Sequence, residues 1–399
     1  MKRVVIANFY PVWPPITGGQ RRVFFLAREL SRAFDVEIVV PERQGTNGTT
    51  VFTPSFRETR VAVEARYRLL EQTVEAEATL SADAAYALHW EACDLYNAVL
   101  AERLGAADAA VTEHPYSIGP LLRARPSEHL PILLDAHNVE VRQKEPLFAT
   151  APRLLEAIAA AESLAARSSA LIADCSSQDA DDFVMRYTVD PSRLAVIANG
   201  VDALGVPILP EDRRVAIRSR LGLENRIGAV FAGSFHQPNL KAVDRVIDFA
   251  RENPAILFVV LGGVSGHAPL SGPTCPDNVL SLGEVDETLK WMILQVCDIG
   301  LNPMESGSGT NIKMFEYAAA GLAVLSTPFG ARGIDVGPDS PLMVREIDAM
   351  RDELIRLRLA DRPTLQAMGR RARQEVIATA DWTVIGRRYV AAVQRALDV

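Results

Sequence analysis

Short apolar runs alternate along the chain with longer segments in which apolar residues recur at helical spacing. In the first half these runs end in polar or glycine-containing loops and occupy residues 4–8, 36–40, 109–112, 132–135, 170–174 and 195–198. The series starts again at residues 229–232, 256–261, 279–282, 298–301, 322–326 and 342–344. Such alternation is typical of a parallel sheet with crossover helices. The pattern therefore predicts an α/β protein with two doubly wound parallel-sheet domains in series.

The boundary between these domains is predicted near residues 200–215, where Asn199-Gly200 ends a strand and prolines precede a charged segment. We therefore assign residues 1–205 to an N-terminal Rossmann-like domain and residues 206–380 to a C-terminal one.

Two further segments are expected to be helical. Residues 56–104 are long and alanine-rich with few turn signals, which predicts a helical excursion from the first domain. Their arginines are nearly balanced by glutamates, which favours a solvated helix face over a membrane-surface helix. In residues 381–399 an apolar stripe at helical spacing includes Ile385, Tyr389 and Val393. We expect this last helix to pack back across the domain seam.

Composition and charge narrow the function classes. Of 399 residues, 48% are hydrophobic and 23% are charged, as in ordinary globular proteins. The formal net charge of -8 argues against general nucleic-acid binding. The cysteines are far apart and lack Cys-x-x-Cys spacing, as expected of reduced thiols, and no run of about 18 apolar residues is present to span a membrane. We expect a cytoplasmic protein, with peripheral contact at the inner membrane face left open.

The most informative motif is a glycine loop that is followed by a short helical pattern, a stop at Gly321 and an apolar strand. Glycine lets the backbone approach an anion closely, and amides at a helix start point their positive ends toward it. Thr310 is the expected N-cap, and Lys313 adds a cation. The motif predicts a phosphate site formed by Gly307, Ser308, Gly309, Thr310, Asn311 and Ile312.

Glu316 lies within the apolar part of the same predicted helix. A carboxylate there needs a partner, and a pair of sugar hydroxyls would serve. The alternative is an ordinary Lys313–Glu316 pair on a solvated face, worth only about a few tenths of a kcal/mol.

Four motifs in order resemble those of glycosyltransferase family 4, whose members are retaining enzymes with the GT-B architecture of two Rossmann-like domains. They are Gly18-Gly19 after the first strand, the segments 135–140 and 196–202, and the glycine loop with its helix. The resemblance spans nearly the whole chain. It implies an interdomain cleft, with residues 1–205 on the acceptor side and residues 206–380 binding a nucleotide-diphosphate sugar.

The resemblance also implies roles for donor-side residues. Glu316 matches the second of two family glutamates and would bind the donor ribose, whereas Ser308 stands at the position of the first, with Glu305 as a candidate substitute. The arginine and lysine that commonly neutralise the donor diphosphate are replaced by a segment beginning Gly233-Ser234, which we keep as donor-binding candidates.

The missing positive charge must come from elsewhere, and Lys313 and Arg332 are the candidates. Arg332 follows a predicted parallel strand, where ligands sit in open α/β sheets, and a guanidinium can fork onto phosphate oxygens. The alternative is that Arg332 pairs with Asp335 and shapes the loop.

In the first domain, the resemblance places His137 close to the transferred sugar, in a positioning role. The alternative is a neutral core histidine held by Asn138 or a carbonyl. Gly18 and Gly19 permit a close approach of the sugar or diphosphate, although a glycine pair can also simply serve a turn.

Acceptor contacts are assigned to three residues. Arg21 and Arg22 are candidates for recognising an acidic group, and His114 follows a strand where it would touch the acceptor. No metal and no cofactor is expected. The Asp-x-Asp pattern at residues 179–181 follows Ser176, which is typical of a helix cap with acidic first-turn residues rather than of a metal site.

Together these features predict a metal-independent retaining glycosyltransferase that uses a nucleotide-diphosphate sugar and a glycan, lipid-linked or small-molecule acceptor. A non-catalytic sugar-nucleotide-binding or scaffold protein on the same fold is the alternative, because Ser308 and the absent arginine-lysine pair depart from the family pattern. A nicotinamide dehydrogenase is disfavoured, since no Gly-x-Gly-x-x-Gly follows the first strand. The donor base, the sugar and the oligomeric state are left open.

Overall fold

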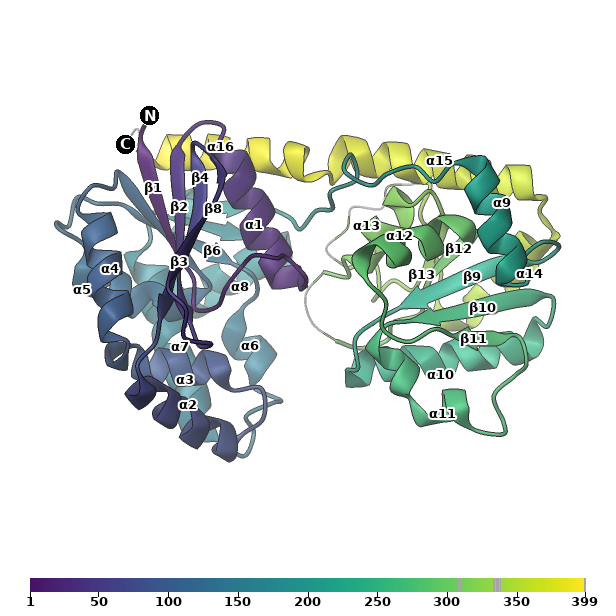
Figure 1. Cartoon of the computed structure of the whole chain (residues 1–399), viewed down its shortest axis with the longest axis horizontal. Coiled ribbons are helices and arrows are strands. Elements are labelled where there is room, and N and C mark those ends of the chain that lie inside the picture. Colours follow the sequence, from purple (N-terminus) through teal and green to yellow (C-terminus); the bar gives the residue numbers. More distant parts are fainter. Residues whose placement is uncertain (308–309, 333, 335–336, 338, 398–399) are drawn as a thin grey trace. The chain divides into compact units, whose positions relative to one another are not determined.

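The chain forms two compact units, each with its own core (Figure 1). The computed structural model describes residues 1–307, 310–332, 334, 337 and 339–397. The first unit contains residues 1–198 and the C-terminal segment from Ile385 onward, and the second contains residues 199–384.

The first unit is built on one sheet with the strand order β3-β4-β2-β1-β5-β6-β7-β8. All neighbouring strands are parallel except the β3–β4 pair, which is antiparallel. The strands are β1 (Arg3–Ala7), β2 (Asp35–Glu42), β3 (Gly48–Thr53), β4 (Phe56–Ala62), β5 (Ala109–Glu113), β6 (Ile132–Ala136), β7 (Leu171–Asp174) and β8 (Leu194–Val196).

Helices cover both faces of this sheet. Side chains that alternate along the strands, such as Val5 and Ala7, join one core with α2 to α5 and with α7, while α16 packs against α1, where Gly386 lies next to Glu29. The helices are α1 (Gly18–Leu30), α2 (Ala65–Glu77), α3 (Ala82–His89), α4 (Asp94–Leu104), α5 (Ile118–Ala124), α6 (Glu140–Lys144), α7 (Pro152–Ser168), α8 (Ser177–Tyr187) and α16 (Trp382–Leu397). Short 3-10 helices lie at Trp90–Ala92, Pro115–Ser117 and Pro191–Arg193.

The start of the predicted helical excursion is wrong, because Phe56–Ala62 is the strand β4. Charged residues hide the strand alternation in the sequence. Glu58 is fully buried and accepts hydrogen bonds from the amides of Val12 (3.2 Å) and Trp13 (2.9 Å), and Arg60 Nε lies 2.7 Å from it. The charges are therefore satisfied within the sheet rather than on a solvated helix face.

The second unit has a parallel sheet with the order β11-β10-β9-β12-β13-β14. Its strands are β9 (Ile227–Ala232), β10 (Ile256–Leu261), β11 (Val279–Ser281), β12 (Ile299–Asn302), β13 (Ala323–Ser326) and β14 (Met343–Val344). Its helices are α9 (Glu211–Arg220), α10 (Gln237–Glu252), α11 (Ala268–Ser271), α12 (Glu287–Val296), α13 (Lys313–Ala319), α14 (Ile347–Leu359) and α15 (Arg362–Thr379), with a 3-10 helix at Gly263–Gly266.

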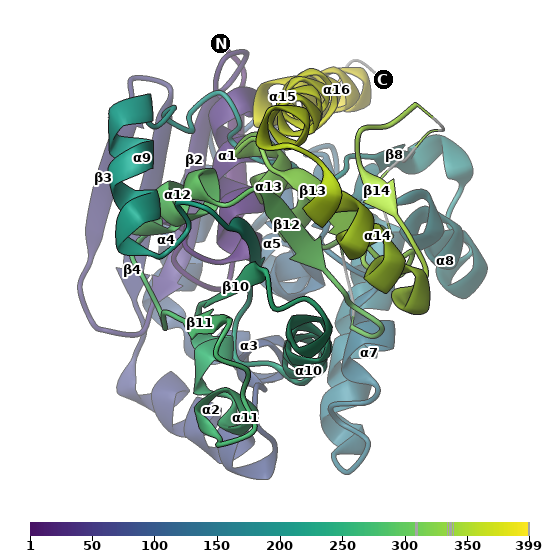
Figure 2. The ribbon, with the colours of Figure 1, turned by 90° about the vertical axis from the view of Figure 1, so that its right-hand side faces the viewer.

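Strand alternation divides this unit into two cores, one on each face of the sheet (Figure 2). Val230 and Val324 pack with residues of α12, α13 and α15. Ala229, Phe231 and Leu325 point to the other face and pack with α10 and α14. The sequence prediction of an α/β protein with two parallel-sheet units is confirmed.

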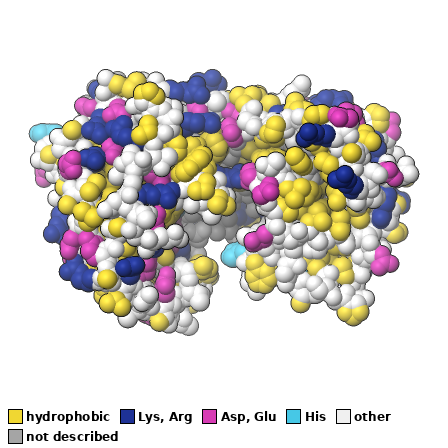
Figure 3. Space-filling view, in the orientation of Figure 1, with side chains coloured by type: hydrophobic (Ala, Val, Ile, Leu, Met, Phe, Trp, Pro, Cys, Tyr) yellow, Lys and Arg dark blue, Asp and Glu magenta, His cyan; other side chains and the backbone are white. Residues whose placement is uncertain are grey.

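The exterior agrees with the modest net charge, since basic and acidic side chains are interspersed on the face of each unit seen in Figure 3. All four cysteines are free thiols. Within the described part of the chain, no helix is both long and apolar enough to cross a bilayer.

Candidate functional site

The glycine-loop region of the second unit lies where three adjacent parallel strands end. The loops after β9, β12 and β13 leave the same edge of the sheet, which is the usual position of ligand sites in this class of fold. Asn302 ties two of these loops together, because its buried side-chain amide donates to Ser326 Oγ (3.0 Å) and to the carbonyl of Gly330 (3.0 Å). Asn311 Nδ2 donates to the same carbonyl (3.1 Å).

Helix α13 begins later than the sequence suggests. Its N-cap is Ile312, with helical backbone angles and no side-chain cap, so the prediction of Thr310 as N-cap is wrong. Asn311 turns its side chain to Gly330, and the first turn is closed by backbone bonds such as Glu316 N to the Ile312 carbonyl (3.1 Å). Ser308 and Gly309, two of the predicted phosphate ligands, lie outside the described residues.

Lys313 points its ammonium group into a small enclosure. Nζ donates to Asn239 Oδ1 (2.8 Å), lies 3.9 Å from Met304 Sδ and sits 4.4 Å above the centre of the Phe231 ring. Burial lowers the pKa of Lys313 to about 7, against the opposing charge of Glu316. A lysine with this pKa gains charge readily when an anion binds nearby.

Glu316 has a partner that the sequence does not reveal. Lys290 Nζ, on α12, lies 2.9 Å from Glu316 Oε1 and 3.0 Å from Glu287. The ammonium of Lys313 donates to Asn239 instead, so the simple i, i+3 pair considered from the sequence does not describe this helix face. Glu305, the candidate substitute for the first family glutamate, is held in an exposed ion pair with Arg245 (2.7 Å).

Arg332 lies beside the glycine loop. Its guanidinium stacks 4.1 Å above the Phe329 ring and donates to the Phe329 carbonyl (3.1 Å). A Cβ atom at Gly307 would lie 3.7 Å from Arg332 Nη2, and Gly307 has a φ of +129°, which side chains rarely adopt. Asp335, the alternative partner of Arg332, lies outside the described residues.

Gly233 and Ser234 follow β9 and contact Asn239, whose Nδ2 donates to the Ser234 carbonyl (3.1 Å). We call Asn239, Lys313, Glu316 and Arg332 the α13 cluster. Sequence reasoning missed Asn239 as a site residue, although its place in a Pro-Asn motif after the first strand of the second unit was a usable signal. The sequence contains no signal that would identify Lys290 as the partner of Glu316, because Lys290 comes from a separate helix.

The first unit gathers its predicted residues at the carboxyl ends of β5 and β6. His137 Nε2 lies 3.0 Å from Glu113 Oε2, and the His137 ring centre is 3.8 Å from that of His114. His114 Nδ1 lies 2.8 Å from Glu140 Oε1, and its Nε2 lies 3.1 Å from the Tyr10 hydroxyl. We call Tyr10, Glu113, His114, His137 and Glu140 the histidine cluster. Of these, Tyr10, Glu113 and Glu140 were not predicted as site residues.

Burial sets the protonation of this cluster. It lowers the pKa of His137 well below its ordinary value, so the ring is neutral at pH 7. It raises the pKa of Glu113 to about 6. Burial alone would raise the pKa of Glu140, but the interactions with His114, Lys144 and Tyr116 together hold it below the usual range. His137 is thus a neutral buried histidine, but its partner is a carboxylate rather than Asn138 or a carbonyl.

Gly18 and Gly19 begin α1, whose capping box joins Thr17 and Gln20. Arg21 is half-buried and its Nε donates to the Ile16 carbonyl (3.3 Å). Arg22 is 1% exposed and pairs with Asp135 (2.5 Å), so the expectation that it recognises an acidic acceptor is wrong. The Arg22 guanidinium therefore neutralises a buried carboxylate within the first unit.

Two places in the first unit offer candidate metal ligands. Ser176 caps α8 as predicted, and Arg142 pairs with Asp179 (2.6 Å) and with Asp182. Glu113, Asp135 and His137 offer ligand atoms within 4.8 Å of one another. The Arg22 guanidinium already neutralises Asp135 there, which disfavours a second cation.

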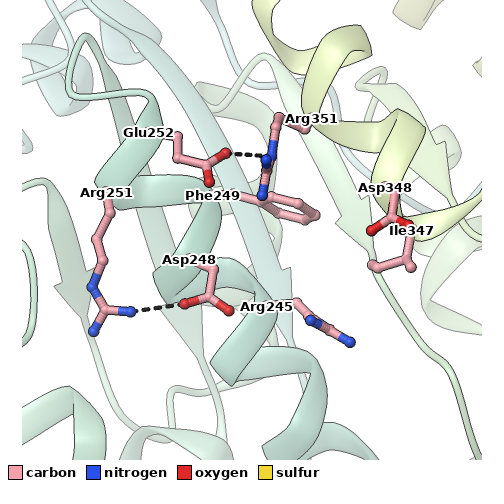
Figure 4. A pocket seen from close by; sticks show the side chains of 8 residues that line it. All are labelled: Arg245, Asp248, Phe249, Arg251, Glu252, Ile347, Asp348 and Arg351. Atoms are coloured by element: carbon pink, nitrogen blue, oxygen red, sulfur yellow. Dashed lines mark hydrogen bonds and ion pairs between the residues drawn. The ribbon is translucent and has the colours of Figure 1, made fainter.

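A surface pocket of the second unit lies between α10 and α14 (Figure 4). Its charges pair with acids, Arg251 with Asp248 (2.7 Å) and Arg351 with Glu252 (2.6 Å), over the buried Phe249. We assign it no ligand.

Profiles of two protein families match the sequence. The one described as Glycosyltransferase Family 4 matches residues 16–203, and the one described as Glycosyl transferases group 1 matches residues 226–359. The chain belongs to the family 4 glycosyltransferases. No curated protein was found to match the chain.

Solved structures share the fold of this glycosyltransferase. Sucrose-phosphate synthase of Thermosynechococcus elongatus has a TM-score of 0.71 at 15% identity, over 98% of this chain and 99% of that one. HepE of Anabaena, solved with UDP-glucose, has a TM-score of 0.69 at 13% identity, over 98% and 99%. WaaG, a glycosyltransferase involved in lipopolysaccharide biosynthesis, has a TM-score of 0.63 at 19% identity, over 98% of both chains. These likenesses show the GT-B fold.

Proposed function

We propose that this glycosyltransferase is a retaining, metal-independent enzyme that moves a hexosyl group from a nucleotide-diphosphate sugar to a glycan, lipid-linked or small-molecule acceptor. The observation that carries the proposal is the α13 cluster, which places two cationic side chains and a carboxylate at the carboxyl edge of adjacent parallel strands.

The two cations match the charge of a departing diphosphate. When the glycosidic bond breaks, negative charge moves onto the phosphate oxygens, and fixed cations and amides stabilise it without a metal. Lys313 follows the glycine loop at the start of α13, Arg332 lies beside Gly307, and the two are proposed to replace the charge of the absent arginine-lysine pair. The backbone of Gly307, Thr310, Asn311 and Ile312, with that of Gly233 and Ser234, is proposed to contact the phosphates.

Glu316 is proposed to accept hydrogen bonds from the ribose hydroxyls. Its pairing with Lys290 through one oxygen (2.9 Å) fixes the direction of the carboxylate. A carboxylate oriented in this way accepts two neighbouring hydroxyls, each in a charge-assisted hydrogen bond.

The first unit is proposed to bind the sugar groups. Gly18 and Gly19 leave the start of α1 without side chains, and His137 contributes a neutral ring that donates or accepts hydrogen bonds without adding charge. Arg21 and His114 are the acceptor-side candidates. Because retaining transfer by same-face attack uses the leaving phosphate to take the acceptor proton, no strong protein base is required.

We further propose a role in surface glycan assembly in the cytoplasm, at the inner face of the membrane. The support is the structural likeness to WaaG, a glycosyltransferase involved in lipopolysaccharide biosynthesis.

The test has two steps. Thermal-shift screening of nucleotide sugars identifies the donor, because a ligand that binds only the folded state raises its stability. The donor is then mixed with candidate acceptors in excess EDTA, and we expect release of nucleoside diphosphate and, by NMR, a product with the donor's anomeric configuration. Dependence on an added metal or inversion would contradict the proposal. Donor binding with no release in any acceptor extract would favour the non-catalytic alternative that Ser308 and the segment after β9 suggest.

A further inference from the structure

Asn239 links two segments that lie far apart in the sequence. It lies in the first turn of α10, and its side chain accepts a hydrogen bond from Lys313 Nζ on α13 (2.8 Å). Its amide nitrogen donates to the carbonyl of Ser234 (3.1 Å) in the loop after β9. Since one end of the amide is fixed by a carbonyl that can only accept, the oxygen must face the ammonium.

Gly233 makes room for this side chain. A Cβ atom at Gly233 would lie 3.1 Å from Asn239 Cγ and 3.2 Å from Val264 Cγ1, so one or the other would have to move. The backbone of Gly233 is outside the left-handed region, and the glycine is therefore not explained by a special turn. The space that the Asn239 side chain needs is a sufficient reason for a glycine at position 233.

The described surroundings of the Lys313 ammonium contain little else that holds it. Met304 Sδ is a weak acceptor at 3.9 Å, and the Phe231 ring offers only its face. Of the charged groups nearby, Glu316 lies three residues further along α13 and is paired with Lys290, and Arg332 lies beside Gly307. Asn239 is thus the strong neutral acceptor that orients Lys313.

We infer that Asn239 is a positioning residue that holds the Lys313 ammonium toward the diphosphate, taking over part of the work of the absent arginine-lysine pair. The inference rests on the proposed function for the identity of the anion. The placement of Lys313 by Asn239 does not depend on it. A neutral acceptor suits this role because a carboxylate would hold the ammonium equally well but would repel the phosphates.

The first experiment reads Lys313 directly in the full chain. Lysine occurs at Lys2, Lys144, Lys241, Lys290 and Lys313, so the Cε signals of 13C-labelled lysine can be assigned by substitution. We expect the Lys313 titration midpoint to fall in Asn239→Ala, to rise in Asn239→Asp and to fall in Gly233→Ala, which displaces the same side chain. Identical titrations in the wild type and Asn239→Ala would overturn the inference, whether or not any nucleotide binds.

The second experiment measures UDP binding by calorimetry between pH 6 and 8.5. Asn239→Ala should weaken binding about tenfold at pH 8.5 and recover toward wild type at pH 6, where Lys313 is charged in both proteins. Asn239→Asp should weaken binding at every pH despite its higher lysine midpoint. Lys313→Met should lose affinity throughout, and Lys241→Ala, which removes an exposed lysine of α10, should bind normally.

These outcomes separate the two hypotheses. A defect in Asn239→Ala that is equal at every pH would show a structural role only and would overturn the inference. Wild-type protein that binds no nucleotide diphosphate, with the expected order of lysine titrations intact, would instead contradict the proposed function.

Discussion

The Tyr10 hydroxyl lies 2.7 Å from the position that a Cβ atom would take at Gly19. The same hydroxyl is 3.1 Å from His114 Nε2, and His137 Nδ1 is 3.7 Å from the same Cβ position. Gly19 therefore leaves the space that the edge of the histidine cluster occupies. A contact of this kind explains the second glycine of the pair better than turn geometry does, since Gly19 is already the second residue of α1.

Gly19→Ala should impair transfer more than stability. The new methyl group must push the phenol away, and a displacement of about 1 Å at a reacting centre costs roughly a hundredfold in rate. Steady-state kinetics of Gly19→Ala, Tyr10→Phe and the double variant test this. The double variant should regain part of the loss, because the clashing oxygen is gone; an equally slow double variant would contradict the steric explanation.

Arg22→Met should destabilise the first unit by about 3–5 kcal/mol, because Asp135 would be left as a buried carboxyl group without its counter-charge. The urea midpoint of the transition that includes the first unit measures the loss. Arg22→Met/Asp135→Leu, which removes both partners, should cost less than the single change. Arg21→Met, at the neighbouring half-buried position, is the control and should shift the midpoint little.

Glu316→Ala should raise the dissociation constant of the donor about 10- to 100-fold, the range expected for losing hydrogen bonds to a charged group. Glu287→Ala is the matched control, since Glu287 also pairs with Lys290 (3.0 Å) but its side chain is 52% exposed. Calorimetry with the donor distinguishes the two. Equal weakening in both variants would show that Lys290, rather than the ribose contact, is responsible.

Asp174→Asn should stabilise the protein increasingly as the pH rises. Asp174 is fully buried, and neither carboxyl oxygen has a hydrogen-bond partner among the described residues. Burial, with a contribution from Asp179, raises its pKa to about 8, against about 3.9 in an unfolded chain. Between these values the folded state keeps a proton that the unfolded state has lost, so the wild type loses stability with rising pH.

The gain in Tm of Asp174→Asn over the wild type should therefore be larger at pH 8 than at pH 5. Asp181→Asn, an exposed change on α8, serves as the control. A gain that is the same at both pH values would mean that Asp174 is charged or solvated in the native state.

The sequence predicted the elements whose signal is local. Every apolar run proposed as a strand overlaps one, and central strands such as β6 and β10 are buried along their whole length, as an unbroken apolar run indicates. The helix predicted to start at residue 56 also failed for a local reason. Buried Glu58 and paired Arg60 conceal the alternation of apolar and polar residues that marks the strand β4. For the α13 cluster, the glycine loop and the positions of the strand ends correctly indicated the part of the second unit in which these residues lie.

Partners could not be predicted in the same way. Arg22 and Asp135 are 113 positions apart, and Lys290 and Glu316 come from different helices. Nothing in either local sequence reveals which charges pair, so the sequence assigns Arg22 to an acceptor and offers Glu316 only sugar hydroxyls or Lys313 as partners. The N-cap residue preference that favoured Thr310 was not enough to place the helix start, since α13 begins at Lys313 with Ile312 as its N-cap.

The chain enters and leaves the second unit at one place, where Val201 and Asp381 form a β-bridge and Leu204 N donates to Asp381 (3.0 Å). The second unit is thus one uninterrupted stretch of polypeptide with adjoining ends, whereas the first combines residues 1–198 with the segment from Ile385 onward. Residues 199–384 are consequently suited to excision as a stand-alone fragment. A stop codon placed after Val384 would instead remove the part of α16 that packs against α1, and would damage the first unit while leaving residues 199–384 whole.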